Sequence, residues 1–326
     1  MDEHNHNQEL DAFLARTIFY PKFKVAYDTL THIYKFGGRD AELVVLIGPV
    51  GAGKSHMIEQ LMLDYPIRDT DEQTFRPILY ARIPPENTYA GLLGNLLEAM
   101  GDPLPWRGLV VERRMRLKSL ITQQQTRMIT LDESQSVIPR SGADAKTANV
   151  KLLLELMNDL KIPILLAGKE DLLALMAADD AIRSRTRCKL SLSYFSCMTR
   201  AGAFDFADYI QGLIGFFPRK VKGFNFFSVL DDGKPVLKKD ISTLIRLILA
   251  TDGCPRSIRF LFKAVIERTT SDTVVELKHF ADAFYTASNL EIPLSFNPLL
   301  DSESSESIAK VSEEAERRGL YDSDAF

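Results

Sequence analysis

Gly48-Pro-Val-Gly-Ala-Gly-Lys-Ser55 follows directly after the apolar run Leu43-Val-Val-Leu-Ile47. The octapeptide fits the pattern G-x-x-x-x-G-K-[ST], and a strand that feeds such a loop is the context in which the pattern marks a phosphate site. Its glycines let backbone N–H groups converge on phosphate oxygens. The helix that starts near Lys54 directs the positive end of its dipole to the same place. The stretch therefore predicts a strand, a phosphate-binding loop and a helix in succession.

The roles of single residues in this loop follow from phosphate chemistry. Lys54 should reach the β- and γ-phosphates of a nucleoside triphosphate, and Ser55 should be a ligand of Mg²⁺. The predicted cofactors are therefore ATP and Mg²⁺. The loop residues that we expect to contact ATP are Gly48, Pro49, Val50, Gly51, Ala52, Gly53, Lys54, Ser55 and His56.

A second apolar run, Arg127-Met-Ile-Thr-Leu131, ends in the acids Asp132 and Glu133. Taken alone, a strand that ends in solvated acids is common. Beside a phosphate loop, the first acid would hold the Mg²⁺ shell, and the second would orient and deprotonate the attacking water. The pair of motifs indicates hydrolysis of a nucleotide and disfavours a chance glycine turn. Glu133 and Lys54 are thus candidate catalytic residues, and Ser55 and Asp132 are candidate metal ligands.

Composition limits the class of protein. The chain has 326 residues, of which 45% are hydrophobic, so it can bury a large core and a smaller second domain. It contains no apolar run of eighteen residues and no recognisable signal peptide, and its three cysteines lack metal-ligand spacing. We therefore expect a cytoplasmic protein without a membrane partner.

The order of elements predicts the fold. Strand-like runs alternate with helical segments up to about residue 198, which argues for a parallel sheet covered on both faces. Helical segments then dominate, and residues 297–326 are rich in charge and poor in aromatics. The expected architecture is α/β: a P-loop core with an N-terminal helical segment at 1–198, a small helical lid at 199–296, and a flexible acidic tail at 297–326.

An α/β P-loop core with an Asp-Glu motif and a helical lid resembles the AAA+ ATPase class. Within the class the chain most resembles the TnsC/TniB family of ATPase regulators of DNA transposition, from about residue 20 to residue 270. Its compact length resembles the TnsC proteins of CRISPR-associated transposons. Asp180-Ala-Ile-Arg-Ser-Arg185 stands where the class places its arginine finger, and Gly253-Cys-Pro-Arg256 where it places the sensor-two arginine. Tyr20-Pro21-Lys-Phe23 stands where such proteins contact adenine.

The resemblance assigns further roles. Arg185 would be the finger that acts on the nucleotide of a neighbouring subunit, with Arg183 as the alternative, and Arg256 would contact ATP. Lys169 departs from the small polar residue that is usual as sensor one. The segment Gly168-Lys169-Glu170-Asp171 superficially resembles the guanine-specifying motif of GTPases, but it lacks the Asn, so GTP is the weaker alternative.

The resemblance also implies partners. The chain would form a ring or filament on double-stranded DNA when ATP lies between protomers, and it would link a CRISPR-type target-selection complex to the transposase subunits. The rival interpretation is a replication or repair ATPase, such as an initiator or helicase loader. A metabolic P-loop kinase would need an acceptor site that the sequence does not reveal.

The net charge is −4, which argues against nucleic acid until its distribution is considered. Residues 300–326 carry eight acids and three bases, so the remainder is nearly neutral. A basic segment could neutralise phosphates without reading bases, although a solvated helix would look the same. The resemblance favours DNA, because this region lines the ring pore in relatives. The candidate DNA-binding residues are Arg113, Arg114, Arg116 and Lys118, with Arg107 and Arg127 beside them, and Arg140 in the loop after Asp132-Glu133.

The acidic tail contains a few apolar residues spaced among acids: Ile308, Val311, Leu320, Tyr321 and Phe326. A peptide of this kind suits a basic, grooved partner on which it becomes ordered. We expect the transposase or an associated endonuclease subunit to be that partner by family analogy, and the alternative is a solubilising tail without a partner.

Overall fold

The apolar run before the glycine-rich loop is the inner strand β1 (Leu43–Ile47), in which every residue is buried. It belongs to a five-stranded parallel sheet in the order β4-β5-β6-β1-β7. The other strands are β4 (Ile78–Arg82), β5 (Met128–Asp132), β6 (Ile164–Gly168) and β7 (Thr186–Ser191). Because all five run in one direction, the loops that follow them meet at one edge, here called the carboxyl edge.

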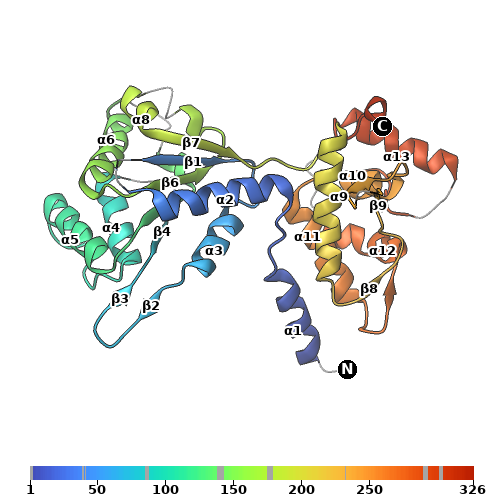
Figure 1. The fold of residues 1–326 in the computed structure, drawn as a ribbon, viewed down its shortest axis with the longest axis horizontal. Coiled ribbons are helices and arrows are strands. Elements are labelled where there is room, and N and C mark those ends of the chain that lie inside the picture. The colour runs from blue at the N-terminus through green and yellow to red at the C-terminus, as the bar shows by residue number, and fades with distance from the viewer. Residues whose placement is uncertain are drawn as a thin grey trace. The chain divides into compact units, whose positions relative to one another are not determined.

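The computed structural model describes residues 3–38, 40, 42–84, 88–137, 143–174, 179–231, 233–288, 293–300 and 304–326. The chain divides into two units, which we call the core unit (Val25–Leu192) and the helical unit (Met1–Lys24 with Ser193–Phe326). Figure 1 follows the chain through both. Within the described residues, no helix is both long and apolar enough to cross a membrane.

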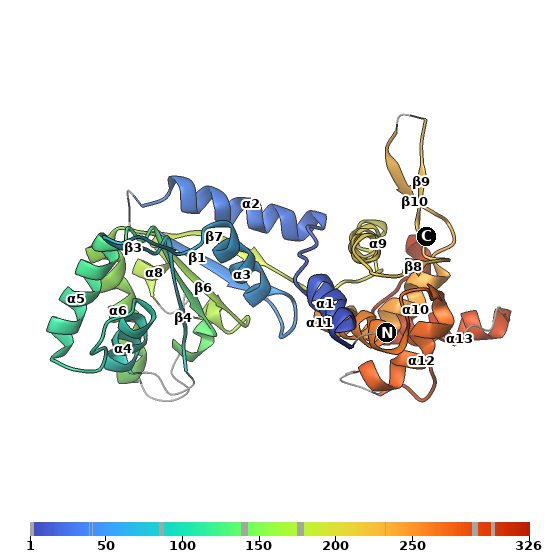
Figure 2. The same ribbon diagram turned by 90° about the horizontal axis from the view of Figure 1, so that it is seen from below.

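Helices cover both faces of the sheet in the core unit. Figure 2 shows α2 (Pro21–Phe36) and α3 (Lys54–Asp64) on one side, and α4 (Tyr89–Ala99), α5 (Val110–Gln123) and α6 (Ala143–Leu160) on the other. On this second face, alternate residues of β1 join a core with leucines of α4, α5 and α6. This alternation of strands and helices confirms the predicted α/β fold with a parallel sheet. The short helix α8 (Asp180–Arg185) precedes β7.

The helical unit contains α1 (Glu3–Leu14), α9 (Arg200–Gly215), α10 (Ser242–Thr251), α11 (Pro255–Arg268), α12 (Leu277–Ala287) and α13 (Ser305–Arg317). Aromatic rings fill its core, where Phe262 meets Phe13 at 6.2 Å and Phe280 at 5.0 Å between ring centroids. A hairpin of β9 (Phe227–Val229) and β10 (Pro235–Leu237) projects away from these helices. The strands β8 (Lys220–Val221) and β11 (Val274–Val275) form a short parallel pair.

The N-terminal segment differs from the sequence-based expectation. We expected residues up to 198 to join the core, whereas the first 24 residues pack within the helical unit and the division falls after Leu192. Arg219 pairs with Glu9 at 2.6 Å, and Arg259 donates to the Leu14 carbonyl at 3.0 Å. These contacts join residues more than 200 positions apart, so no local pattern could reveal them.

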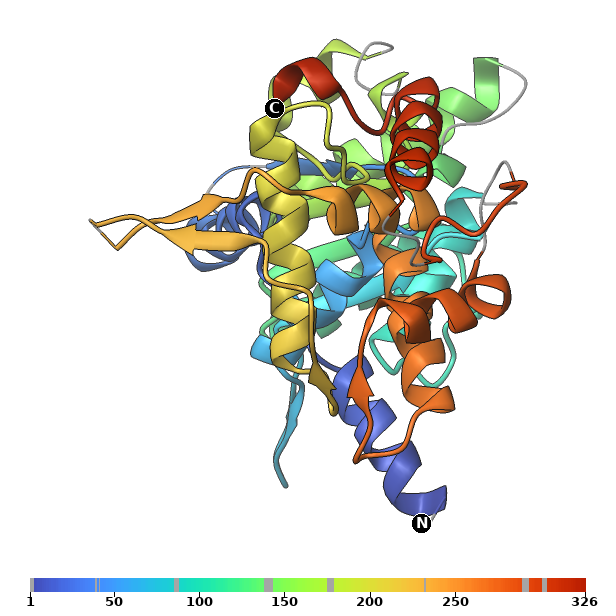
Figure 3. The same ribbon diagram turned by 90° about the vertical axis from the view of Figure 1, so that its right-hand side faces the viewer.

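The flexible acidic tail is a second correction. Residues 305–317 form α13, whose Val311 and Ala315 are buried, and the helix packs against α10 (Figure 3). Buried Arg246 of α10 donates to the Pro298 and Leu300 carbonyls at 2.7 and 3.1 Å. Ile308, Val311 and Ala315 follow the 3-4 spacing of a helix face. The spacing was visible in the sequence, but the acids around it favoured the wrong prediction of a loose segment.

The chain end is held by charge as well. Arg318 contacts Asp252 at 3.3 Å and Glu314 at 2.8 Å. Hydrogen bonds from Arg317 and Arg318 lower the pKa of Glu314 to about 2. The Cys197 backbone N–H donates to the Leu320 carbonyl at 2.7 Å. The C-terminal segment is thus also bonded to the segment that follows β7.

The sequence also missed a small hairpin in the core unit. Strand β2 (Arg68–Asp69) pairs with β3 (Thr74–Phe75) in antiparallel fashion, between α3 and β4. Two-residue strands carry too little periodicity to be recognised by pattern.

Candidate nucleotide site

The glycine-rich loop lies at the carboxyl edge, between β1 and α3. Gly48 donates its N–H to the Gly168 carbonyl at 3.2 Å. A Cβ at Gly48 would lie 2.3 Å from the Leu192 carbonyl oxygen, so only glycine fits between these strands. Gly53 has φ of 100° directly before the helix, a conformation that other residues rarely adopt. The loop is therefore fixed by its neighbours in the sheet before any ligand arrives.

Lys54 is the first residue of α3. Its ammonium donates to the carbonyls of Gly48 and Pro49 at 2.7 and 2.9 Å, so the side chain curls over the loop. The helix N-terminus leaves backbone N–H groups free to meet an anion, and the ammonium adds a full positive charge beside them. Loop, helix end and lysine thus form one anion-binding surface.

Ser55 and Asp132 meet across the sheet edge, although they are 77 positions apart. The Ser55 hydroxyl donates to Asp132 Oδ2 at 2.8 Å, and the Tyr80 hydroxyl lies 3.4 Å from the same oxygen. Hydroxyl and carboxylate oxygens are the ligands that Mg²⁺ prefers when it also carries substrate phosphates and water. The residues therefore fit the predicted metal. Among the described residues, no group of three or more His, Cys, Asp or Glu side chains could hold a metal by itself.

Glu133 follows Asp132 in a left-handed conformation, with φ of 55°. Its backbone N–H donates to Asp132 Oδ1 at 2.8 Å. The Glu133 carboxylate accepts a hydrogen bond from the Gln135 amide and lies 3.7 Å from Arg82. A strained backbone at this position separates the two acids, so that one can hold a metal and the other a proton.

Gln135 and Arg82 are site residues that the sequence reasoning did not single out. The Gln135 carbonyl oxygen accepts from the Lys169 backbone N–H at 3.2 Å, while its amide reaches Glu133. A Cβ at Gly168 would lie 2.4 Å from that oxygen, so a larger residue there would displace the Gln135 side chain. Gln135 thus connects the second acid to the strand beside the loop. The sequence held one signal for Arg82: it is a charged residue at the carboxyl end of a buried strand, where the site residues of a parallel sheet gather.

The other predicted residues lie in several places. In the core unit, Arg185 of α8 donates to the Ala181 carbonyl at 3.1 Å and to Asn158 at 3.4 Å. Exposed Arg183 pairs with Asp180, and His56 pairs with Glu59 at 3.8 Å. Arg256 is an exposed residue in the first turn of α11, in the helical unit. Arg140 lies outside the described residues.

The basic helix α5 differs from its sequence impression. Arg114 pairs with Glu155 at 2.8 Å and Asp159 at 3.4 Å, and Arg116 pairs with Asp102 at 2.9 Å. Arg113 donates to the carbonyls of Gly108 and Ala90. Exposed Lys118 has no such partner in the described part of the chain. Three of the four predicted DNA contacts therefore hold α5 to its own unit.

The arrangement as a whole contains the parts that cleavage of a phosphoanhydride requires. An anion-binding loop, a pair of metal-binding oxygens and a separate carboxylate lie at one edge of the sheet. Catalysis of phosphoryl transfer depends mainly on positioning and on charge stabilisation, and these groups supply both.

Comparisons with known proteins agree with this geometry. A family model described as "Bacterial TniB protein" matches residues 13–191, more than half of the chain. No curated protein sequence matches significantly.

Three solved structures show the likeness of fold. CDC6P from Pyrobaculum aerophilum has a TM-score of 0.56 at 12% identity, covering 97% of this chain and 86% of that one. The Aeropyrum pernix ORC1 protein, solved in complex with DNA, has a TM-score of 0.52 at 14% identity, covering 95% and 87%. The Aeropyrum pernix ORC2 protein, solved as ADPNP–ADP complexes, has 0.52 at 14%, covering 83% and 67%. At such identities the similarity concerns the fold alone.

Proposed function

The chain belongs to the bacterial TniB family of P-loop AAA+ ATPases, and from this premise we propose that it is an ATP-dependent, DNA-binding regulator of transposition. The observation that carries the proposal is the family match over a core in which Ser55 and Asp132 meet at 2.8 Å beside the phosphate loop. The archaeal initiator structures share the fold, but the family match favours transposition over replication.

The roles in hydrolysis follow from the site. The loop and Lys54 bind the β- and γ-phosphates, and Ser55 and Asp132 hold Mg²⁺, which neutralises phosphate charge. Glu133 accepts the proton of the attacking water. Its hydrogen bond to Gln135 and its nearness to Arg82 hold the carboxylate in a defined position before ATP arrives.

The assembly follows from α8. Among the described residues, the hydrogen-bond partners of Arg185 are uncharged, so its charge stays available to a neighbouring subunit. We propose that it acts on the γ-phosphate of that neighbour, with Arg183 as the alternative, and that Arg256 contacts the nucleotide in its own chain. ATP between protomers would then drive a ring or filament on double-stranded DNA, which links a target-selection complex to the transposase subunits.

The DNA contacts need revision in the light of α5. Lys118 and Arg107 are exposed and have no ion pair within the described residues, so we propose that they contact phosphates, together with Arg140. Arg113, Arg114 and Arg116 then position the helix and add to its field. Glutamate at Arg107 and Lys118 should lower the slope of log affinity against log salt by about two units. Glutamate at exposed Lys189 of β7 is the matched control.

The deciding experiment images the full chain with double-stranded DNA and a slowly hydrolysed ATP analogue. We expect rings or filaments that require both ligands, and reconstituted transposition that requires ATP. A mixture of Arg185→Ala and Lys54→Ala proteins should recover part of the ATPase activity at hybrid interfaces. A chain that stays monomeric with both ligands would contradict the proposed assembly, and transposition that proceeds without the protein would contradict the regulatory role.

A further inference from the structure

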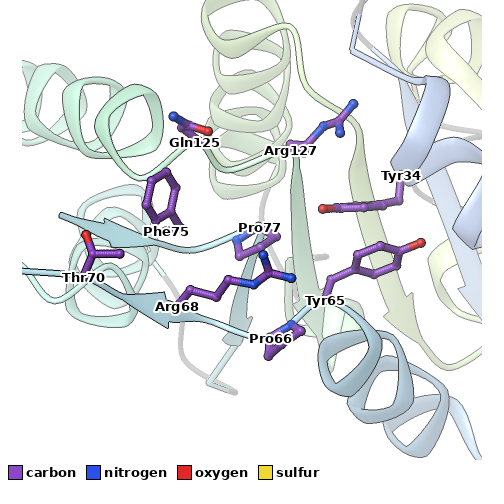
Figure 4. A pocket seen from close by; sticks show the side chains of 9 residues that line it. All are labelled: Tyr34, Tyr65, Pro66, Arg68, Thr70, Phe75, Pro77, Gln125 and Arg127. Atoms are coloured by element: carbon purple, nitrogen blue, oxygen red, sulfur yellow. The ribbon is translucent and has the colours of Figure 1, made fainter.

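A cavity of about 500 Å³ lies at the amino edge of the sheet, the edge opposite the nucleotide site. Arg127 precedes β5, and Pro77 precedes β4. Tyr34 of α2, Tyr65 at the end of α3, and Arg68 and Phe75 of the β2–β3 hairpin complete its wall (Figure 4). Five-residue strands separate the two edges by about 16 Å at 3.3 Å per residue. This amino-edge pocket is therefore distinct from the phosphate loop, and its size suits a small organic ligand.

Planar groups dominate the pocket. The rings of Tyr34 and Tyr65 lie 3.9 Å apart between centroids, and the Arg127 guanidinium lies 5.5 Å from the Tyr34 centroid. Figure 4 shows Arg68 extending beside Pro77 toward the tyrosine pair. The Phe75 ring lies farther from that pair, on the side of the hairpin that faces Gln125. Tyr34 is buried, whereas Tyr65 and Phe75 are partly exposed. Partly exposed rings beside guanidinium planes offer stacking surfaces to a flat ligand.

The pocket carries two positive charges that no carboxylate neutralises. None of its lining residues is Asp or Glu. Arg127 donates to the Lys35 carbonyl at 3.1 Å and lies over a ring, so its partners are neutral. Arg68 has no ion pair in the described part of the chain. Burial raises the pKa of Tyr34, and the positive charges of Arg127 and Arg68 both oppose that rise. Both arginines are therefore near enough to act electrostatically on the Tyr34 hydroxyl.

We propose that the amino-edge pocket binds a nucleotide unit, with the base against the exposed aromatic surface and its phosphate on the guanidinium group of Arg68, while Arg127 adds to the positive field. Guanidinium forks match phosphate oxygens, and stacking on aromatic rings tolerates any base. The side-chain amide of Gln125 offers hydrogen-bonding groups to a base edge. The unit belongs to a single strand of nucleic acid or to a free nucleotide, both of which present the same base and phosphate.

An acidic peptide is the rival ligand, and the structure disfavours it. A peptide that adds as a strand would gain little here, because β2 and β3 are each only two residues long. The C-terminal segment of the chain, which is acidic and aromatic, already has contacts within the helical unit. Arg200 lies over the ring of Phe326, and the backbones of Cys197 and Tyr321 pair in an isolated β-bridge.

The test uses the full chain with Lys54→Ala, which disables the phosphate loop, and fluorescence anisotropy or calorimetry. The probes are a five-nucleotide oligothymidylate, free thymidine monophosphate, and a synthetic peptide of residues 320–326. We expect the oligonucleotide to bind. Binding of the mononucleotide as well identifies a free nucleotide as a sufficient ligand, and binding of the oligonucleotide alone identifies a strand. Binding of the peptide alone overturns the proposal.

Variants in the same background locate the site. Arg68→Ala should weaken oligonucleotide binding about tenfold, because it removes one charge-assisted hydrogen bond. Tyr65→Ala should also weaken it about tenfold by loss of stacking, and Tyr65→Phe should restore it. Lys189→Ala removes an exposed cation elsewhere on the unit and should leave binding unchanged. If Arg68→Ala and Tyr65→Ala bind as well as their parent, the strand binds elsewhere and the proposal fails, whatever the outcome of the ATPase and assembly experiments.

Discussion

In the core unit, polar side chains gather at the carboxyl edge of the sheet, beside the phosphate loop. In the helical unit, buried polar side chains hold distant chain segments together. At the carboxyl edge, a chain of hydrogen bonds joins Ser55, Asp132, Glu133 and Gln135 beside the phosphate loop. In the helical unit, buried Arg219 and Arg246 bond to glutamate and to backbone carbonyls. Charge at an open edge is available for catalysis, while charge inside a packed unit is already used for folding. Substitutions in the two regions should therefore change different quantities.

The largest effect is expected for Lys54→Ala. The change removes the cation that faces the β- and γ-phosphates, so ATP hydrolysis should fall at least about a thousandfold and nucleotide binding should weaken. Thermal unfolding without nucleotide should stay close to that of the parent, because water can replace the ammonium at the carbonyls of Gly48 and Pro49. Retained ATP affinity and turnover would remove the loop from the site.

Glu133→Gln should keep ATP bound and slow hydrolysis by about a hundredfold or more, since the amide cannot accept the proton of water. DNA complexes formed with ATP should last longer. Single-turnover hydrolysis measures the first expectation, and dissociation from labelled DNA measures the second. Hydrolysis within about threefold of the parent would mean that another group is the base.

Arg246→Met tests the helical unit. The arginine is buried and bonds to the Pro298 and Leu300 carbonyls, so its loss should destabilise the native state by about 2–3 kcal/mol. Hydrogen exchange should show α13 opening first. Arg317→Met, at an exposed site on α13, is the control and should leave the free energy of unfolding nearly unchanged. Lost ATPase activity with unchanged stability would break the contrast between the two units.

Gln135→Ala is expected to have the smallest effect. It removes the hydrogen bond that holds Glu133 and the one from the Lys169 backbone. ATP hydrolysis should therefore slow by about tenfold, which corresponds to an activation barrier higher by about 1.4 kcal/mol. Gln135→Glu is the variant to compare with it. A second carboxylate beside Glu133 should raise the pKa of the base, so the pH profile of hydrolysis should move to higher pH. Identical profiles for both variants and the parent would show that Gln135 does not position the base.

The core strands and the phosphate loop could be predicted because their signals are local. Leu43–Ile47 is a short apolar run bounded by a glycine loop, and Met128–Asp132 ends in acids. The helix α13 was mispredicted although its apolar spacing is also local, because acidic composition was given more weight than periodicity. Its docking on α10 depends on Arg246, 61 residues away from its Ser307 contact, which no window along the chain can show.

The sequence by itself determined the nucleotide chemistry and the order of strands and helices, because a glycine-rich loop and apolar periodicity act through neighbouring residues. The tertiary structure alone decided which polar groups meet. It placed Gln135 between Glu133 and Lys169, paired Arg114 with the acids of α6, and gathered Arg68 and Arg127 into one pocket. The physical reason is that a parallel sheet brings residues from separate strands to a common edge, and the identity of those neighbours depends on strand order and register rather than on distance along the chain.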